Sequence, residues 1–236
     1  MPKATYLRFF LDFDGTLVPL ASHPDAVLLE AKRRHLLTEV AQRYPTAIVS
    51  GRSRNSLLRH LGDGPWHLIG DHGCDAGDDY SPLPQEVLKQ FTEATDKLAQ
   101  QLPADTFLEK KKYSFTLHYR HKPELKNAYH GLLAQFLAES EITTFYQLTQ
   151  AKMAWEIRPH FNKGDAVFRL LAKNPGFPIV IGDDTTDEAM FSQVVPNGLC
   201  VHVGSSSDTL APYHIDDVAG VWSFLSQFQK PVASQN

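Results

Sequence analysis

Residues 6–16 read YLRFFLDFDGT, a short apolar run that ends in two acids and a glycine. A run of this length and composition fits a buried parallel strand that leads into a functional loop. Two further apolar runs, TAIVS at 46–50 and HLI at 67–69, are also followed by glycine. Segments with helical spacing at 27–44 and 54–61 separate the three runs. This β-α-β-α-β order predicts a doubly wound parallel sheet, that is, a Rossmann-like α/β core.

The middle of the chain has a different pattern. Residues 107–119 alternate apolar and polar side chains, which predicts one antiparallel, half-exposed strand. Two helical runs and two strand-like runs surround it, at 86–102, 125–138, 143–148 and 152–157. We therefore expect a small α+β domain at 79–160, inserted into the core.

The parallel pattern resumes after the inserted segment. Short apolar strands are expected at 178–181 and 199–203, and helices at 165–171, 187–194 and 221–228. The core domain should accordingly comprise residues 1–78 and 161–236.

Composition excludes several classes of protein. The 236 residues carry a formal net charge of −4 and no basic run, which disfavours binding to nucleic acid. No apolar run approaches the ~18 residues of a membrane span. The two cysteines, Cys74 and Cys200, match no metal or redox spacing, which favours a reducing compartment. The first residues lead straight into a strand and leave no room for a signal peptide, so a cytoplasmic location is expected.

The strongest chemical signal is Asp12-Phe13-Asp14-Gly15-Thr16. In open α/β sheets ligands bind beyond the carboxyl ends of the strands, which is where this loop should lie. Asp12 and Asp14 share one side of the chain and repel each other, and a divalent cation would relieve that repulsion. The alternative is a turn with solvated acids, because Asp and Gly are common in turns.

A second acidic cluster, GDDTTDE at 182–188, also follows an apolar strand. Four acids within six residues indicate a cation, and Mg²⁺ suits all-oxygen ligands. The structural alternative is a helix N-cap at Asp184 or Thr186, and the two interpretations are compatible.

Two further segments follow the same order along the chain. Ser50-Gly51-Arg52 comes after the second strand, where a hydroxyl and backbone N–H groups can hold phosphate oxygens. Lys163 stands at an expected helix start, where the positive helix end disfavours a cation unless an anion is bound there. Taken alone, Ser50 or Lys163 would more often be a surface residue. Their position after separate strands of one sheet favours function.

The order DxDGT, Ser, Lys and GDD resembles the haloacid dehalogenase superfamily of phosphotransferases, and the inserted domain resembles that superfamily's second type of cap. FLEKKKYSFTLHYR at 107–120, KMAWEIRPHFNK at 152–163 and GDDTTDE resemble the trehalose-6-phosphate phosphatase family. The resemblance runs from about residue 9 to residue 225. The chain departs from the family at His72-Gly73-Cys74-Asp75, where HG is often followed by one residue and then Glu.

Several residues of the cap suit a sugar site. Glu109 and Lys111 are two apart on the expected alternating strand and share a face, and Lys152 and Glu156 are four apart on another strand. Charged groups bind sugar hydroxyls strongly and directionally. Arg120 could hold the sugar or the phosphate. For Lys110 and Lys112 we expect a salt-bridged outer face, and for His118 packing or hydrogen bonding within the cap.

The resemblance implies a Mg²⁺-dependent hydrolysis of trehalose 6-phosphate to trehalose and phosphate through an aspartyl-phosphate. Asp12 would be the nucleophile and Asp14 the general acid and base, with Ser50 and Lys163 holding the phosphoryl oxygens. The resemblance assigns the metal to Asp12, Asp14 through its carbonyl, and Asp183, oriented by Asp184 and Asp187. It assigns substrate binding to Gly51, Arg52, His72, Glu109, Lys111, Arg120, Lys152 and Glu156. It also suggests a functional link to a trehalose-6-phosphate synthase.

Three alternatives remain open at this point. The substrate could be another glycosyl phosphate, such as sucrose phosphate or mannosyl-phosphoglycerate. The chain could be a sugar phosphomutase, which shares the aspartyl-phosphate step. It could also be a sugar-phosphate sensor without turnover, although a sensor needs no proton donor such as Asp14.

Overall fold

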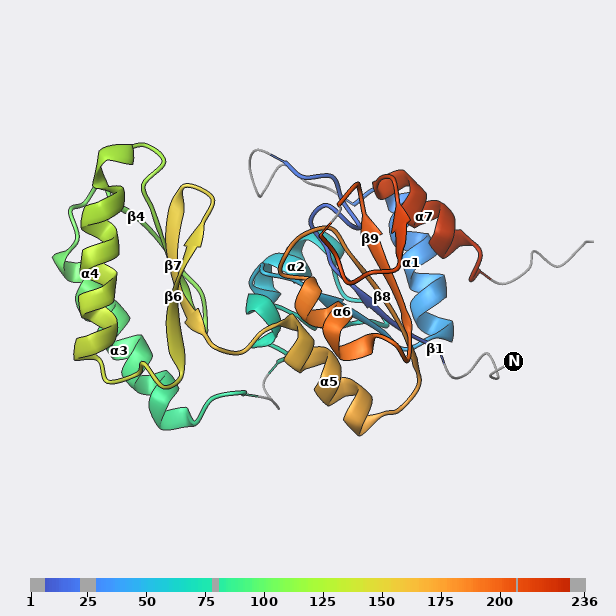
Figure 1. Cartoon of the computed structure of the whole chain (residues 1–236), viewed down its shortest axis with the longest axis horizontal. Helices are drawn as coiled ribbons and strands as arrows, with labels where there is room; N and C mark the ends of the chain where they lie inside the picture. Colours follow the sequence, from blue (N-terminus) through green and yellow to red (C-terminus); the bar gives the residue numbers. More distant parts are fainter. Residues whose placement is uncertain (1–6, 22–28, 78–80, 207, 230–236) are drawn as a thin grey trace, which may run out of the picture. The chain divides into compact units, whose positions relative to one another are not determined.

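The computed structural model describes residues 7–21, 29–77, 81–206 and 208–229. Two compact units make up the chain (Figure 1). The core unit comprises Met1–Ala76 and Asn162–Asn236, and the cap unit comprises Gly77–Phe161.

The core unit contains a six-stranded sheet in the order β10-β9-β8-β1-β2-β3. All its neighbouring strands run parallel. From β1 the chain adds β2 and β3 on one side and β8, β9 and β10 on the other, so the strand order reverses between β1 and β8. Ligands bind in doubly wound sheets at the carboxyl ends of such strands. The strands are β1 (Leu7–Leu11), β2 (Thr46–Val49), β3 (His67–Ile69), β8 (Phe177–Gly182), β9 (Leu199–Val203) and β10 (Tyr213–Ile215).

Helices cover both faces of this sheet, which explains why its central strands are continuous apolar runs. On one face α1 (Ala31–Arg43), α2 (Arg54–Leu61) and α7 (Val218–Ser226) share a hydrophobic cluster with alternate residues of the strands. On the other, α5 (Lys163–Lys173) packs against α6 (Glu188–Val194), which lies against β8 and β9. Figure 1 shows α1 beside α7, and α5 beside α6.

The cap unit contains a four-stranded antiparallel sheet in the order β4-β5-β7-β6. Its strands are β4 (Phe107–Lys110), β5 (Phe115–His118), β6 (Tyr146–Ala151) and β7 (Ala154–Pro159). Both α3 (Gln85–Gln101) and α4 (Lys126–Glu139) lie on one face of it (Figure 1). Phe91 of α3 stacks on Tyr146 at 4.4 Å between ring centroids, and Phe136 of α4 meets Phe115 edge-on at 5.3 Å. These aromatic contacts fix the two helices to the sheet.

The predicted fold class is confirmed: a parallel α/β core carries an inserted α+β unit. Helix α2 and strands β3 and β9 have the predicted bounds, and most other elements differ by a few residues. The short 3₁₀ turns Asp71–Gly73 and Pro123–Leu125 and the strand β10 were not predicted. Residue 6 and residues 27–28, where a strand and a helix were expected to begin, lie outside the described residues.

The prediction of one strand over residues 107–119 is wrong. The segment is a hairpin, in which β4 and β5 are joined by a turn that the Lys111 N–H closes onto the carbonyl of Ser114 at 2.9 Å. Apolar alternation continues through the turn because Tyr113 is itself fully buried. The placement of Lys152 on a strand is also wrong, since it lies in the turn between β6 and β7.

Replacement of glycine by alanine should have opposite effects on stability at two helical positions, Gly164 and Gly131. A methyl group on Gly164 in α5 would lie 2.1 Å from the carbonyl oxygen of Ala189. Gly164→Ala should therefore lower the free energy of unfolding of the core unit by about 1–3 kcal/mol. Beside Gly131 in α4 the corresponding space is open in the described part of the chain. Gly131→Ala should instead stabilise the cap unit by roughly 0.5–1 kcal/mol, because alanine loses less backbone freedom in a helix. Urea unfolding followed by circular dichroism measures both, and equal effects would contradict this account.

Candidate active site

Asp12 directly follows β1, at the point where the strand order of the sheet reverses. The Asp12 N–H donates to the carbonyl of Ile181 in β8 at 2.9 Å, and the Asp12 side chain is buried. Gly15 follows with φ +80°, and a Cβ at this position would lie 2.0 Å from Oδ2 of Asp183. Glycine therefore permits both the turn after β1 and the close approach of the loop after β8.

Lys163 stands in the first turn of α5, yet its side chain is buried and contacts two carboxylates. Its Nζ donates to Oδ1 of Asp12 at 2.7 Å and to Oδ1 of Asp187 at 2.8 Å. Burial would lower the pKa of Lys163, but the charges of Asp12 and Asp187 outweigh burial, so the pKa lies above its usual value. The side chain of Asn162 caps the helix itself. The sequence predicts an anion beside Lys163, and in the free protein the carboxylates of Asp12 and Asp187 fill that role.

Asp187 anchors the second acidic loop. Its Oδ2 accepts the N–H groups of Asp183 and Asp184 at 2.9 and 3.1 Å. Asp184 in turn accepts the N–H and the hydroxyl of Thr186 at 2.8 and 2.6 Å. The alternative of a helix cap at Asp184 or Thr186 is wrong, because the N-cap position of α6 is Asp187. Burial would raise the pKa of Asp184, but the charge of Lys163 and these hydrogen bonds lower it.

Asp183 and Asp12 carry raised pKa values. Burial raises the pKa of Asp183 to about 7, with a further contribution from the charge of Asp187. Burial also raises the pKa of Asp12 well above its usual value, against the opposing effect of Lys163. A raised carboxyl pKa means that the negative charge is poorly compensated in the free protein. The cluster therefore favours any further positive charge that can reach it.

A divalent cation fits this cluster. One carboxylate oxygen from each of Asp12, Asp183 and Asp187 lies within 4.8 Å of the others. Carboxylate oxygens are the ligands that hard cations such as Mg²⁺ prefer. Both oxygens of Asp187 already accept hydrogen bonds, from Lys163 and from the loop backbone. Asp12 and Asp183 are thus the better candidates for direct ligands, and Asp187 orients them.

Asp14 and Arg52 form a bidentate pair. The Nε and Nη2 atoms of Arg52 each donate to one Asp14 oxygen at 2.6 Å, and the guanidinium lies 5.3 Å from the ring centroid of Phe13. Its Nη1 is 3.4 Å from Nε2 of His60, whose Nδ1 is 2.7 Å from the carbonyl of Ser56. Since a carbonyl only accepts, Nδ1 carries the hydrogen and Nε2 can accept from the arginine. Arg52, expected to bind substrate, therefore holds Asp14 in the free protein.

The loops after β2 and β3 are locked together beside this pair. The buried hydroxyl of Ser50 accepts the Arg52 N–H at 3.2 Å, and the Ser50 carbonyl accepts the His72 N–H at 3.0 Å. A methyl group on Gly51 would lie 2.6 Å from the His72 ring. Asp75, where the chain departs from the family pattern, pairs its backbone with Gly70. Ser50 thus reaches the same sheet edge as Asp12, because both follow neighbouring parallel strands.

Two of the predicted sugar residues of the cap, Glu109 and Glu156, lie on the face of its sheet opposite α3 and α4. Glu109 is directly across from Thr116, Thr116 from Glu156, and Glu156 from Thr149. Cross-strand partners point to the same face, whereas Phe115, the neighbour of Thr116, packs on the helices. We call Glu109, Thr116, Glu156 and Thr149 the polar row.

Glu156 is the centre of the polar row. It is only 6% exposed, and its Oε1 accepts hydrogen bonds from Nζ of Lys111 at 3.1 Å and from the hydroxyl of Thr116 at 3.4 Å. Lys111 lies just beyond β4 and nevertheless reaches the row from the turn. The structure therefore brings Lys111 and Glu156 together, with the half-exposed Glu109 at the end of the row.

The remaining predicted residues of the cap are on its surface. Arg120 follows β5 and Lys152 lies in the β6–β7 turn, and both are exposed. Lys110 forms the expected salt bridge, with its Nζ 2.7 Å from Oδ1 of Asp96, but Asp96 belongs to α3, so this bridge lies on the helix-covered side of the sheet and not on an outer face. The expectation that His118 bonds within the cap is confirmed by its 3.1 Å contact with Glu109.

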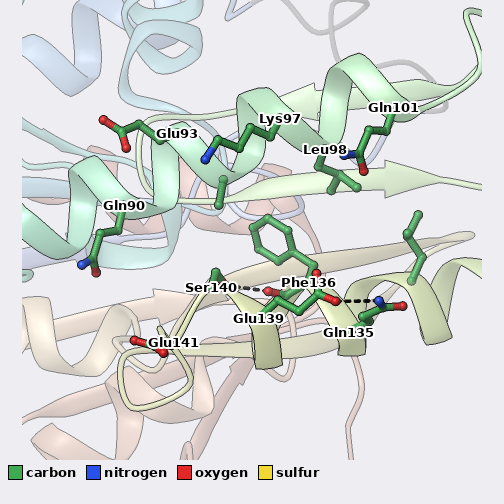
Figure 2. Close-up of a pocket in the computed structure, with 12 residues that line it drawn as sticks. Gln90, Glu93, Lys97, Leu98, Gln101, Gln135, Phe136, Glu139, Ser140 and Glu141 are labelled. Carbon is green, nitrogen blue, oxygen red and sulfur yellow. Dashed lines mark hydrogen bonds between the residues drawn. The ribbon is translucent and has the colours of Figure 1, made fainter.

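A pocket of about 490 Å³ also lies between α3 and α4 (Figure 2). Leu98 and Phe136 contribute apolar surface, and Gln135 donates to Glu139 at 2.6 Å within it. Among its lining residues Lys97 is the one cation, and the acids are Glu93 of α3, Glu139 of α4 and Glu141 just beyond α4. This pocket therefore lacks the paired aspartates and buried lysine that make the core cluster a candidate for catalysis.

Three contributing residues were not anticipated from the sequence. Asn162 caps α5 in a capping box with Asp165, and the spacing N-x-x-D was a usable signal. His60 and Thr116 carry no such signal, because their contacts with Arg52 and Glu156 depend on the fold. Within the described residues, every helix is too short or too polar to span a bilayer.

Comparison with known proteins gives a consistent answer. The family model described as trehalose-phosphatase matches residues 10–219. Trehalose 6-phosphate phosphatase RA3 of Zea mays is 30% identical over 94% of this chain and 70% of its own length. A protein of Oryza sativa subsp. japonica named "Probable trehalose-phosphate phosphatase 4" is 31% identical over 92% of this chain and 64% of its own. The chain thus spans about two thirds of the length of these curated relatives.

Solved structures agree with the sequence comparison. A trehalose-6-phosphate phosphatase related protein superposes with a TM-score of 0.75 at 25% identity, over 93% of this chain and 96% of its own. The C-terminal domain of Candida albicans trehalose-6-phosphate phosphatase gives 0.68 at 25% identity, over 95% and 92%. A phosphatase of the haloalkanoate (HAD) superfamily from Bacteroides thetaiotaomicron gives 0.62 at 14% identity, covering 96% of both chains, which shows the fold alone.

Competition with protons predicts that the carboxylate cluster binds divalent cations more tightly as pH rises. A cation binds the ionised carboxylate, and Asp183, with a pKa of about 7, is mostly protonated at slightly acidic pH. The affinity for Mn²⁺ should therefore rise about tenfold per pH unit up to pH 7 and then level off. Calorimetric titrations between about pH 5.5 and 8.5 measure this dependence. Asp183→Asn should bind weakly at every pH, while the exposed Asp63→Asn should behave as wild type. An affinity independent of pH would contradict the assignment.

Proposed function

Because the chain belongs to the trehalose-phosphatase family, a family of phosphoric monoester hydrolases, we propose that it hydrolyses trehalose 6-phosphate to trehalose and phosphate. The observation that carries the proposal is the buried Asp12 at the strand-order reversal, hydrogen-bonded to Lys163 and two residues before Asp14. A carboxylate placed in this way suits covalent catalysis by phosphoryl transfer.

We assign the attack on phosphorus to Asp12. Its Oδ1 bonds Lys163, so we assign Oδ2 as the oxygen that forms the new bond to phosphorus while the bond from phosphorus to the sugar oxygen breaks. In the second half, water adds to the phosphorus of the aspartyl-phosphate and the bond to Asp12 breaks, which releases phosphate and restores the carboxylate. Lys163 keeps its charge throughout and would also stabilise the phosphoryl oxygens.

Asp14 would move the proton in both halves. It protonates the leaving sugar oxygen and later accepts a proton from the attacking water. In the free protein both Asp14 oxygens accept hydrogen bonds from Arg52. This pairing suits the second half, where Asp14 acts as a base. In the first half Arg52 must release at least one oxygen, and the phosphoryl group is the anion that could attract it.

A divalent cation is implied by the family, and we propose Mg²⁺ held by Asp12, Asp183 and the carbonyl of Asp14, with Asp184 and Asp187 orienting the loop. The ion would offset repulsion between the phosphoryl group and the carboxylates. Ser50, Gly51 and Arg52 would bind phosphoryl oxygens from the loop after β2, and His72 packs against that loop.

We propose that the cap, residues 79–160, recognises the sugar. The polar row with Lys111 offers carboxylate, ammonium and hydroxyl groups of the kind that bind sugar hydroxyls. Arg120 and Lys152, which are exposed, remain proposed contacts at its edge. A functional link to a trehalose-6-phosphate synthase and a cytoplasmic location also remain proposals.

Phosphate release from a panel of sugar phosphates tests the function. Trehalose 6-phosphate should be the best substrate in Mg²⁺, and excess chelator should abolish turnover reversibly. Asp12→Asn, nearly isosteric, should lose at least the ~10²–10⁴-fold that acid–base groups typically supply while remaining folded. Three results would contradict the proposal and support an alternative. They are a preference for sucrose phosphate or mannosyl-phosphoglycerate, formation of an isomeric sugar phosphate, and binding without release of phosphate. Retention of more than about a tenth of the activity in Asp12→Asn would refute the covalent mechanism.

If the cap binds the sugar and the core carries out the phosphoryl transfer, one variant should affect a single substrate and another should affect both. Glu156→Gln removes a charge from the polar row and should lower kcat/KM for trehalose 6-phosphate about ten- to a hundredfold, as expected for a lost charged hydrogen bond. Its rate on p-nitrophenyl phosphate, which has no sugar, should change less than about twofold. Lys163→Met should depress both substrates.

The matched control is Glu139→Gln, on an exposed part of the same cap, which should leave both rates unchanged. Thermal melting establishes that all variants are folded. Equal losses on both substrates for Glu156→Gln would remove the polar row from sugar recognition.

A further inference from the structure

An exposed aromatic pair stands beside the polar row. Phe107 is 59% exposed and stacks on His118, with ring centroids 4.6 Å apart and planes 26° apart. The two residues are directly opposite each other on β4 and β5. Phe107 and Glu109 are two apart on β4, so the pair shares a face with the polar row. The next cross-strand partners after His118 are Ala154 and Ala151, which have only methyl side chains. The rings of Phe107 and His118 are therefore the only large side chains among these four partners.

His118 connects this pair to the polar row. Its Nε2 is 3.1 Å from Oε2 of Glu109, and because a carboxylate accepts, Nε2 carries the hydrogen. The imidazole is therefore held on one side by Glu109 and on its face by Phe107. Glu109 is in turn in register with Thr116 and Glu156. An apolar surface and a line of charged and hydroxyl groups thus lie side by side on one sheet.

We propose that Phe107, held in place by His118, is a specificity-determining residue that stacks on the apolar face of one hexose ring of the substrate, while the polar row binds hydroxyls of that sugar. A pyranose presents C–H groups on its faces and hydroxyls around its edge. A complementary site therefore needs an apolar platform adjacent to a few well-placed polar groups. This inference rests on the proposed hydrolysis of a glycosyl phosphate and adds a contact that the charged residues alone do not provide.

A single exposed apolar residue is ordinary on protein surfaces and by itself indicates nothing. Phe177, 39% exposed at the start of β8, is such a residue, at the sheet edge opposite the carboxylate cluster. Phe107 differs because its ring is stacked, and because a buried carboxylate with a lysine partner lies in the adjacent row. It also occupies β4, an edge strand, where exposed apolar side chains favour association between chains. Its position is therefore better explained by a ligand.

Steady-state kinetics with trehalose 6-phosphate and p-nitrophenyl phosphate test the proposal. Phe107→Ala should raise KM for trehalose 6-phosphate roughly three- to tenfold, the effect of one aromatic contact, with kcat changed less than about twofold. Phe107→Tyr, which keeps the ring, should retain the wild-type KM. Phe107→Leu, apolar but without a ring, should show a raised KM. The matched control Phe177→Ala should be indistinguishable from wild type, and p-nitrophenyl phosphate should not distinguish any of the four variants.

Binding of trehalose, measured by calorimetry, gives a readout that needs no turnover, and Phe107→Ala should weaken it by the same factor. An unchanged KM and trehalose affinity in Phe107→Ala would overturn the inference. Equal losses on p-nitrophenyl phosphate would also overturn it, because Phe107 would then act on cap folding. If the wild-type protein releases no phosphate from trehalose 6-phosphate, the proposed function fails. In that case weaker trehalose binding by Phe107→Ala than by Phe177→Ala would still support the stacking contact, and equal binding would overturn it.

Discussion

The ammonium of Lys163 lies buried between the carboxylates of Asp12 and Asp187, and the arrangement of the carboxyl edge of the parallel sheet depends on this contact. It ties together three segments that are distant in sequence: the end of β1, the start of α5 and the loop before α6. Removing one partner of a buried ion pair typically costs about 3–5 kcal/mol, because the other charge is left uncompensated. The contact therefore fixes the position of Asp12 in the free protein, and the catalysis that we propose for Asp12 would require such preorganisation.

The ion pairs of Lys163 with Asp12 and Asp187 also leave an excess of negative charge. One ammonium faces two buried carboxylates, and Asp183 adds a third acid whose pKa is already raised to about 7. The second oxygen of Asp187 accepts backbone N–H groups of the loop, so Asp187 orients the loop and is a poorer candidate for a direct metal ligand. A protein that needed only stability would avoid such a cluster. One that must bind a cation and a phosphoryl group benefits from acids that are held together but incompletely neutralised.

The sequence was informative where strands are buried on both faces. TAIV of β2 and PIVI of β8 are buried throughout because helices cover both sides of the sheet, and the candidate site residues Ser50 and Asp183 follow these strands directly. Their convergence at one edge could be predicted because parallel strands end on the same side. The hairpin at Lys111–Ser114 could not, since the buried Tyr113 continues the apolar alternation through the turn. The Arg52–Asp14 pair depends on side chains 38 residues apart, which no local pattern encodes.

The two sheets are suited to different tasks for the same physical reason. In the parallel sheet the central strands β1, β2 and β8 are largely buried, so the candidate site residues are confined to the loops at its carboxyl edge, next to the buried ion pairs. In the antiparallel cap sheet one face packs on α3 and α4 through Phe115 and Tyr146, and the opposite face carries the polar row. Residues on that second face are neighbours across strands but contribute little to the aromatic packing beneath them. On the proposed function, side chains of this face that select the substrate could therefore vary while the ion pairs of the core stay unchanged.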